Sequence, residues 1–248
     1  MIAETIEYKN QKIEIIQDEC PENPLELWDC MPELHSTGGS GDIDLLAPEL
    51  TRDQIKKNAA TICELTGEKT LLALSSNNTD YYRSNYEDAT FMVNTAICNR
   101  VEELSKSDKC DALATLFNIA GIRALSEGIS GYSQDSYATV LVIATPEWIK
   151  ETGIRDANIE RALQSTIETY AAWRYGDVYG FSVEELELSC FGFYGAHGSK
   201  EYNYMIEEAK HAIDYELQER ASKRIKKLST LIKNKTPLTL RAEILATI

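Results

Sequence analysis

The stretch YATVLVIA, residues 137–144, is the strongest strand signal in this chain, and it ends at Thr145 and Pro146. It is short, apolar and rich in β-branched residues, whereas helical spacing dominates before and after it. A strand set between helical segments predicts a sheet that is half buried under helices. We therefore expect an α+β fold in which a small antiparallel sheet packs with helices.

The segments that follow this strand predict a helix and then a hairpin. Asp156 is placed to cap a helix that ends at Gly176. Residues 178–183 and 186–193 then flank Glu184 and Glu185, as the two strands of a β-hairpin flank its turn. The turn residues are not the Asn-Gly type of a tight primed turn, so the pattern leaves the register open.

The final element predicted is one long helix. Apolar residues recur every three or four positions from Tyr202 to Ile232, after a possible N-cap at Ser199. About eight helical turns are too long for a small domain to cover. We expect the distal half to fold back over the body, to pair with a second copy or to reach a partner.

Upstream, Lys12–Gln17 predicts a strand, and residues 45–128 predict a helical unit. The expected helices are one capped by Thr51 and stopped by Gly67, one from Glu87 through Leu104, one capped by Asp108 and stopped by Gly121, and a short one over Arg123–Glu127. The Gly- and Ser-rich residues 36–44 predict a linker or loop. The expected division is an α+β core of residues 1–44 and 129–198, an inserted helical unit of residues 45–128, and a basic helix over residues 199–248.

Charge is divided unevenly along the chain. Residues 1–219 contain 17 Lys and Arg against 39 Asp and Glu, a net charge of −22, whereas residues 220–248 contain 8 against 1, a net charge of +7. An acidic body opposes binding of a polyanion, so direct nucleic-acid binding is not expected of the body. A nucleic-acid-associated protein that uses the basic C-terminal helix stays an alternative function. A protein with a basic groove is the expected partner of the body.

Composition also bounds location and redox state. No apolar run reaches the roughly 20 residues of a membrane span, and the acidic N-terminus does not resemble a secretory signal. The six cysteines form no C-x-x-C pair, so we expect reduced, mostly buried thiols and neither a metal site nor a cofactor. These features together favour the cytoplasm.

Four short motifs carry a resemblance to a known family. They are IEIIQDECPENP with Trp28-Asp29, GYSQ (131–134) with Thr145-Pro146-Glu147-Trp148, GDVYGF (176–181) and CFGFYG (190–195). In these motifs the chain resembles a family of phage- and prophage-encoded proteins whose activity is not settled. The resemblance implies a phage or mobile-element origin and a small α+β domain. Glycine beside aromatic residues in strands also indicates rings packed closely on the backbone.

A hydrolase at residues 131–197 is the alternative reading of the same region. Ser133 lies in a G-x-S-x-D sequence that lacks the second glycine of a nucleophile elbow and precedes its strand. His197 follows the CFGFYG motif, where Asp177 or Cys190 is expected to approach it across the hairpin. Adjacent carboxylates usually point in different directions and solvate the surface, so no metal site is expected.

Binding is therefore expected in preference to catalysis. The sequence predicts a phage or mobile-element accessory protein that binds and inhibits a host nucleic-acid-processing defence complex, of the anti-CRISPR or anti-restriction type. The C-terminal helix is expected to serve for docking or as the contact of a homodimer. The predicted acidic contact residues are Glu102, Glu103, Asp108, Asp111, Glu184, Glu185, Glu207 and Glu208. The predicted basic contact residues are Arg220, Lys223, Arg224, Lys226 and Lys227.

Overall fold

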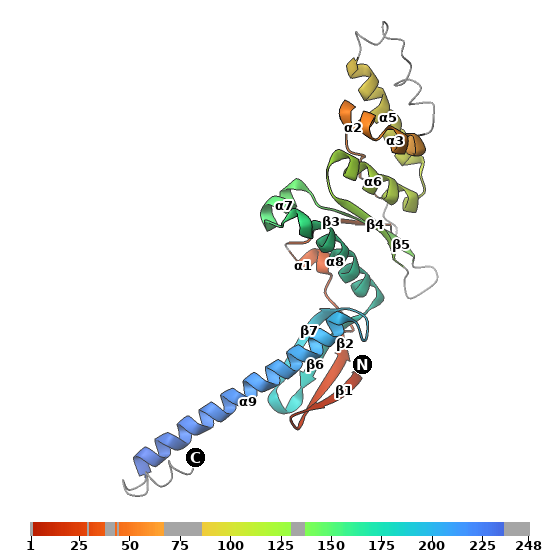
Figure 1. Ribbon diagram of the computed structural model, residues 1–248. Helices are drawn as coiled ribbons and strands as arrows, with labels where there is room; N and C mark the ends of the chain where they lie inside the picture. Colours follow the sequence, from red (N-terminus) through yellow and green to blue (C-terminus); the bar gives the residue numbers. More distant parts are fainter. Residues whose placement is uncertain are drawn as a thin grey trace. The chain divides into compact units, whose positions relative to one another are not determined.

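The computed structural model describes residues 2–28, 30–37, 43, 45–66, 86–129 and 137–235 (Figure 1). The fold is α+β with antiparallel sheets and a long C-terminal helix, as predicted. The chain divides into two compact units, one of residues 22–175 and one of residues 1–21 with 176–248. These bounds differ from the predicted division: residues 45–128 share a unit with 22–44 and 129–175, and the C-terminal helix belongs to the unit that contains the N-terminus.

The unit of residues 22–175 is built on a three-stranded antiparallel sheet. Its order is β3 (Glu33–Ser36), β5 (Ala138–Ile143) and β4 (Ala124–Ile129), so the stretch predicted as the strongest strand is the central one. Every residue of β5 is buried. Leu141 and Ile143 join one core, while Val140 and Val142 join the other. Helices cover both faces of this strand, which explains why its residues are apolar on both sides. The expectation of a half-buried sheet was therefore wrong for this unit.

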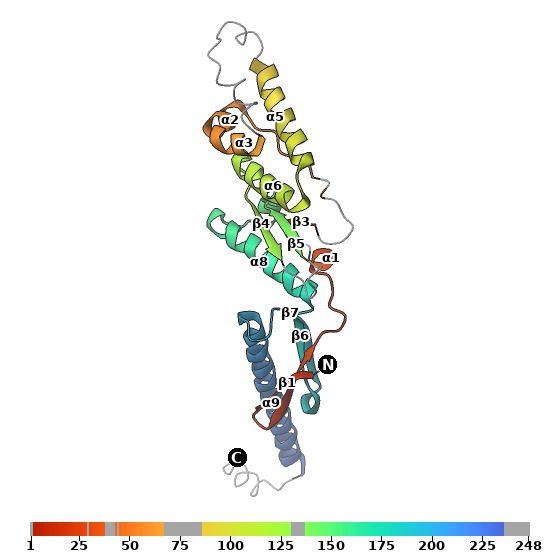
Figure 2. The ribbon, with the colours of Figure 1, turned by 90° about the vertical axis from the view of Figure 1, so that its right-hand side faces the viewer.

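Helices cover the two faces of this sheet in two groups, which Figures 1 and 2 show on opposite sides of it. One core is formed with α2 (Arg52–Lys57), α3 (Ala59–Thr66), α5 (Tyr86–Glu103) and α6 (Lys106–Ala120). The other is formed with α1 (Pro24–Leu27), α7 (Pro146–Thr152) and α8 (Asp156–Tyr175). The result is a three-layer unit with the sheet in the middle.

Capping residues near in sequence set several of these helix ends. Thr51 caps α2 in a capping box with Gln54, as its position predicts. Gly121 ends α6 in the left-handed conformation that glycine favours. Asp108 does not cap α6, because Ser105 is the N-cap and its hydroxyl accepts from the Asp108 amide. The predicted helix over Arg123–Glu127 is wrong, since Ala124–Ile129 pairs with β5 as strand β4.

The other unit contains a four-stranded antiparallel sheet and one helix. The strand order is β1 (Ile2–Tyr8), β2 (Gln11–Gln17), β6 (Val178–Val183) and β7 (Leu188–Tyr194). β6 and β7 form the predicted hairpin, joined by a 3-10 turn, η1 (Glu184–Leu186). Helix α9 (Lys200–Lys235) packs on one face of this sheet. Strand β1 was not predicted from the sequence.

Helix α9 begins where the sequence predicts. The Ser199 hydroxyl accepts a hydrogen bond from the Tyr202 amide at 3.1 Å. Its first turns bury Tyr202, Met205, Ala209 and Ile213 against Ile13, Ile15 and other apolar residues of the sheet. With 36 residues the helix is about 54 Å long, which is longer than the sheet that covers it. No helix in the described part of the chain has the length and apolar content that crossing a lipid bilayer requires.

Candidate partner-binding surfaces

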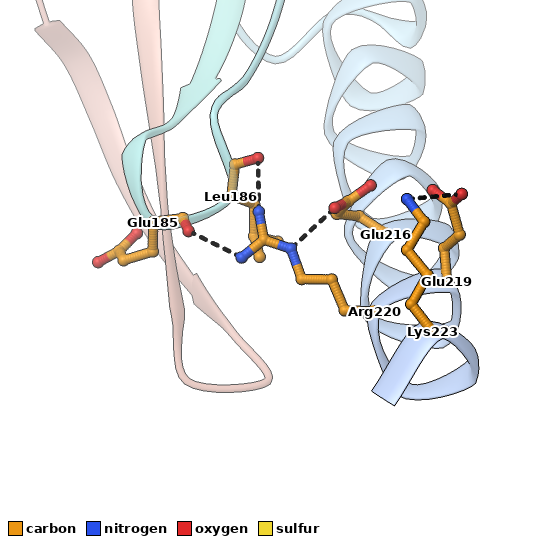
Figure 3. Close-up of polar contacts among 6 residues, drawn as sticks. All are labelled: Glu185, Leu186, Glu216, Glu219, Arg220 and Lys223. Carbon is orange, nitrogen blue, oxygen red and sulfur yellow. Dashed lines mark hydrogen bonds and ion pairs between the residues drawn. The ribbon is translucent and has the colours of Figure 1, made fainter. Parts of the chain in front are cut away.

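Arg220 holds α9 on the turn of the β6–β7 hairpin (Figure 3). Its guanidinium donates to the backbone carbonyls of Glu185 at 3.4 Å and Leu186 at 3.2 Å, and Nε donates to the Glu216 carboxylate at 2.8 Å. One side chain therefore joins the helix to two carbonyls of the turn. The structure gives Arg220, predicted as a partner contact, an intramolecular role as a clamp.

The turn that Arg220 clamps presents carboxylates to solvent. Glu184, Glu185 and Glu187 are all exposed. Arg220 bonds the Glu185 carbonyl and leaves its carboxylate pointing away, as Figure 3 shows. Glu187 has a φ of 57°, a left-handed conformation that closes the turn after η1. The hairpin turn, defined as Glu184, Glu185 and Glu187, thus holds three carboxylates on a rigid support.

The predicted acidic residues of the other unit lie where α5 ends and α6 begins. Glu102, Glu103, Asp108 and Asp111 are exposed, and we call them the α5–α6 corner. Glu103 pairs with Arg100 at 3.4 Å, and the corner segment also contains Lys106 and Lys109. Two of its carboxylates accept from hydroxyls, Asp108 from Ser105 at 2.7 Å and Asp111 from Ser126 at 2.6 Å. Cations therefore dilute the negative charge of this corner.

Acidic charge is denser in the unit that contains the hairpin turn. Up to Glu219, residues 1–21 and 176–219 of this unit contain 4 Lys and Arg against 15 Asp and Glu, a net charge of −11 in 65 residues. Residues 22–175 contain 13 against 24, also −11, but in 154 residues. On α9 itself Glu207 pairs with Lys210 at 2.7 Å, and Glu208 approaches His211 at 3.9 Å. The hairpin turn is therefore the stronger acidic candidate.

Beyond Arg220, helix α9 extends as an exposed arm, which we define as residues 221–235. All side chains from Ala221 to Leu228 are exposed. Lys223 bonds Glu219 one turn earlier at 2.9 Å, and this hydrogen bond raises the pKa of the Lys223 ammonium. Within the described chain, Arg224, Lys226 and Lys227 have no ion-pair partner. The predicted basic contacts thus divide into a clamp, one helix-internal pair and three free cations.

The residues of the alternative hydrolase reading are placed differently from the prediction. Ser133 lies outside the described residues. Cys190 is exposed on β7, and its Sγ lies 3.9 Å from the Phe191 carbonyl oxygen. The His197 Nε2 lies 3.6 Å from the Glu4 carboxylate, where Asp177 or Cys190 was the expected partner.

Sequence reasoning missed the cluster around Glu4 because its members are far apart in the chain. The Tyr202 hydroxyl donates to the Glu4 carboxylate at 2.8 Å, and the His197 ring packs on the Tyr202 ring with centroids 4.5 Å apart. Burial, with the Glu4 hydrogen bond second, raises the pKa of the Tyr202 hydroxyl. Burial also raises the pKa of the Asp177 carboxyl. The cluster ties β1 to the first turn of α9.

The cysteines and pockets supply little reactive chemistry. Cys20, Cys30 and Cys190 are exposed and Cys110 is buried, so the expectation of mostly buried thiols was wrong. Two open pockets in the unit of residues 22–175, one beside Asn94 and one beside Arg123, are lined by neither cysteine nor histidine. Among the described residues, no three His, Cys, Asp or Glu side chains are grouped as metal ligands.

Comparison with known proteins provides no family for this chain. Neither the family models, the curated proteins nor the solved structures contain a significant match.

Proposed function

We propose that this protein acts by binding, and that its acidic surface occupies the cationic nucleic-acid groove of a host defence complex. The observation that carries the proposal is the hairpin turn, where Glu184, Glu185 and Glu187 are exposed in four consecutive residues. Carboxylates on a rigid support can take the place of phosphates in a basic groove, and a strongly negative body speeds encounter with it. The resemblance of four short motifs to those of phage-encoded proteins favours a target in a bacterial host.

Preorganisation supports the hairpin turn over the other acidic residues. Arg220 fixes the turn through backbone carbonyls, so the carboxylates stay available to a partner. The backbone of the turn is then ordered before a partner binds, which lowers the entropic cost of association. At the α5–α6 corner, Arg100 pairs with Glu103, and Lys106 and Lys109 lie within the same segment. The corner is therefore the natural comparison site.

The test is a binding measurement with purified CRISPR effector and restriction complexes at low and high salt. We expect binding at low salt that weakens as salt rises, because charge steering is screened within a Debye length of about 10 Å at 0.1 M salt. The double variant Glu184→Gln with Glu185→Gln should slow association several-fold. The matched control is Glu102→Gln with Glu103→Gln, which removes the same charge from the other unit and should have the smaller effect.

Two results would contradict the proposal. Absence of binding to every complex at all salt concentrations removes the proposed activity. Equal weakening by the two double variants assigns binding to total charge and removes the role of the hairpin turn. Thermal melting of each variant checks that the fold is intact, and surface substitutions of this kind usually change stability by less than about 0.5 kcal/mol.

A further inference from the structure

The arm of α9 exposes large aliphatic side chains at regular spacing. Ile225 is 56% exposed and Leu228 is 47% exposed, and Ala221 precedes them by one turn. The sequence continues the spacing at Ile232, seven residues after Ile225. Scattered apolar residues are normal on a surface, but a spaced row of them on one helix indicates a contact.

This row begins where the packed face of the helix ends, because Leu217, one turn before Ala221, is still partly buried against the sheet. At 100° per residue, Ala221, Ile225 and Leu228 fall within about 60° of the helix circumference, a narrow seam. The seam lies roughly a third of a turn around the helix from the fully buried row of Tyr202, Ala209 and Ile213, and it follows the line of Leu217 at the edge of the packed face. The sheet that covers the first turns of α9 therefore leaves this seam open.

We propose that a second copy of this chain covers the seam, and that the two arms form a short parallel coiled coil. Spacings of four, three and four residues place Ile225 and Ile232 at the a positions of a heptad and Ala221 and Leu228 at the d positions. β-branched residues at a with leucine at d favour two parallel strands. A narrow seam also suits one facing helix better than a sheet, which needs a wider apolar face.

The charges of the arm fit this arrangement. Lys223, Lys226 and Lys227 occupy the f, b and c positions, on the side of the helix away from the seam. Arg224 occupies a g position, and the e position that it would face across the seam is Ser229. From Ala221 to Ile232 the arms can therefore pair without bringing like charges together, and Lys235, at the next d position, ends the seam. A nucleic acid would contact the same cations but would leave the aliphatic row uncovered.

The clamp makes the arm a defined element. Arg220 fixes the last covered turn of α9 to the β6–β7 turn, and the seam starts at the next residue, Ala221. Dimerisation would bring together two copies of the unit that carries the hairpin turn. Two linked sites bind a repeating partner more tightly than one does. The pairing does not depend on the proposed function and can be tested alone.

Association is tested by sedimentation equilibrium of the full chain at micromolar and higher concentrations. We expect a monomer–dimer equilibrium for the unchanged protein. The double variant Ile225→Gln with Leu228→Gln should raise the dimer dissociation constant at least about tenfold, because it removes the buried layers of the seam. The control, Lys223→Gln with Lys226→Gln, should leave the constant within about threefold. Both variants should keep the melting temperature of the monomer, since these side chains are exposed.

Orientation is tested by cross-linking. With Cys20, Cys30 and Cys190 replaced by serine, an Ala221→Cys variant should form an intermolecular disulfide under mild oxidation, because a parallel d layer brings equivalent residues within disulfide reach. Lys223→Cys at the outer f position should not. A monomer at every concentration, or a dimer indifferent to the Ile225 and Leu228 changes, overturns the proposal. A monomer whose arm retards a labelled DNA duplex in a gel also overturns the proposal. A dimer that fails to cross-link at position 221 overturns the parallel orientation.

Discussion

Arg220 shows how one side chain acquires a role that its neighbours in the sequence do not reveal. It begins the basic segment and was predicted to contact a partner, yet its guanidinium bonds two carbonyls that lie about 35 positions earlier. Arg224 is one helical turn further and has the same side chain, but it lies beyond the turn of the hairpin. Arg220 is therefore a clamp and Arg224 a free cation because the sheet ends between them along the helix.

Cys110 allows a prediction at the scale of one residue. Burial raises the pKa of its thiol to about 11. The native state therefore holds the proton to a higher pH than the unfolded chain, so its contribution to stability is complete below pH 9 and is lost as the pH rises toward 11. At pH 8 we expect Cys110 to stay unlabelled in the native protein and to react in urea, because the thiolate is the reactive form.

The measurement is alkylation followed by peptide mass spectrometry, with the exposed Cys190 as the internal control. Cys190 should be labelled in the native protein long before Cys110. Labelling of the two at equal rates without denaturant would contradict the burial of Cys110.

At the scale of the element, the β6–β7 hairpin depends on a strand glycine. A methyl group on Gly180 would meet the Phe191 ring and would lie 2.6 Å from the Cys190 carbonyl oxygen. The ring of one strand therefore covers the bare backbone of the next, which is the packing that the glycine-aromatic motifs predict. The register also shifts between Tyr179 and Phe181, at Gly180 itself.

We expect Gly180→Ala to lower the free energy of unfolding by about 1–3 kcal/mol, because Cys190 contributes backbone that cannot move aside cheaply. Ser182→Ala, two residues along the same strand, is the control and should cost less than about 1 kcal/mol. Urea unfolding followed by circular dichroism measures both. Equal stability of Gly180→Ala and the unchanged protein would show that the hairpin accommodates the methyl group.

Elements that depend on partners elsewhere in the chain were the ones missed. Ser199, Thr51 and Gly121 were correct predictions because a helix end is decided by residues within one turn. Strand β4 was mistaken for a helix because its sequence, ALSEGI, has little strand character and becomes a strand by pairing with β5. Tertiary pairing can override such weak local preference.

At the scale of the whole molecule, one unit interrupts the other. Residues 22–175 form a contiguous unit, whereas the second unit needs residues 1–21 and residues 176–248 together. The reason is strand order: β2 pairs with β6, so the sheet is completed only when the two ends of the chain meet. Ile13 and Ile15 of β2 are fully buried in the core of that unit.

We therefore expect a fragment of residues 22–175 to fold alone with a cooperative thermal transition. A fragment of residues 176–248 should not, because it lacks the strand that buries its core. Joining residues 1–21 to it through a flexible linker should restore cooperative folding, measured by circular dichroism and calorimetry. Non-cooperative melting of the 22–175 fragment would contradict the division into units.

The sequence by itself determined the elements whose causes are local: the apolar strand at 138–143, the hairpin around Glu184 and Glu185, and the helix that starts after Ser199. It also determined the charge division, since composition needs no fold. Only the tertiary structure decided that Arg220 is a clamp, that Glu4 meets His197 and also Tyr202, which is 198 positions away, and that Ile225 and Leu228 have no sheet above them. Those outcomes depend on which distant segments meet in the fold. The spacing of apolar residues predicts which face of a helix or strand is apolar, but it does not predict which other element will cover that face.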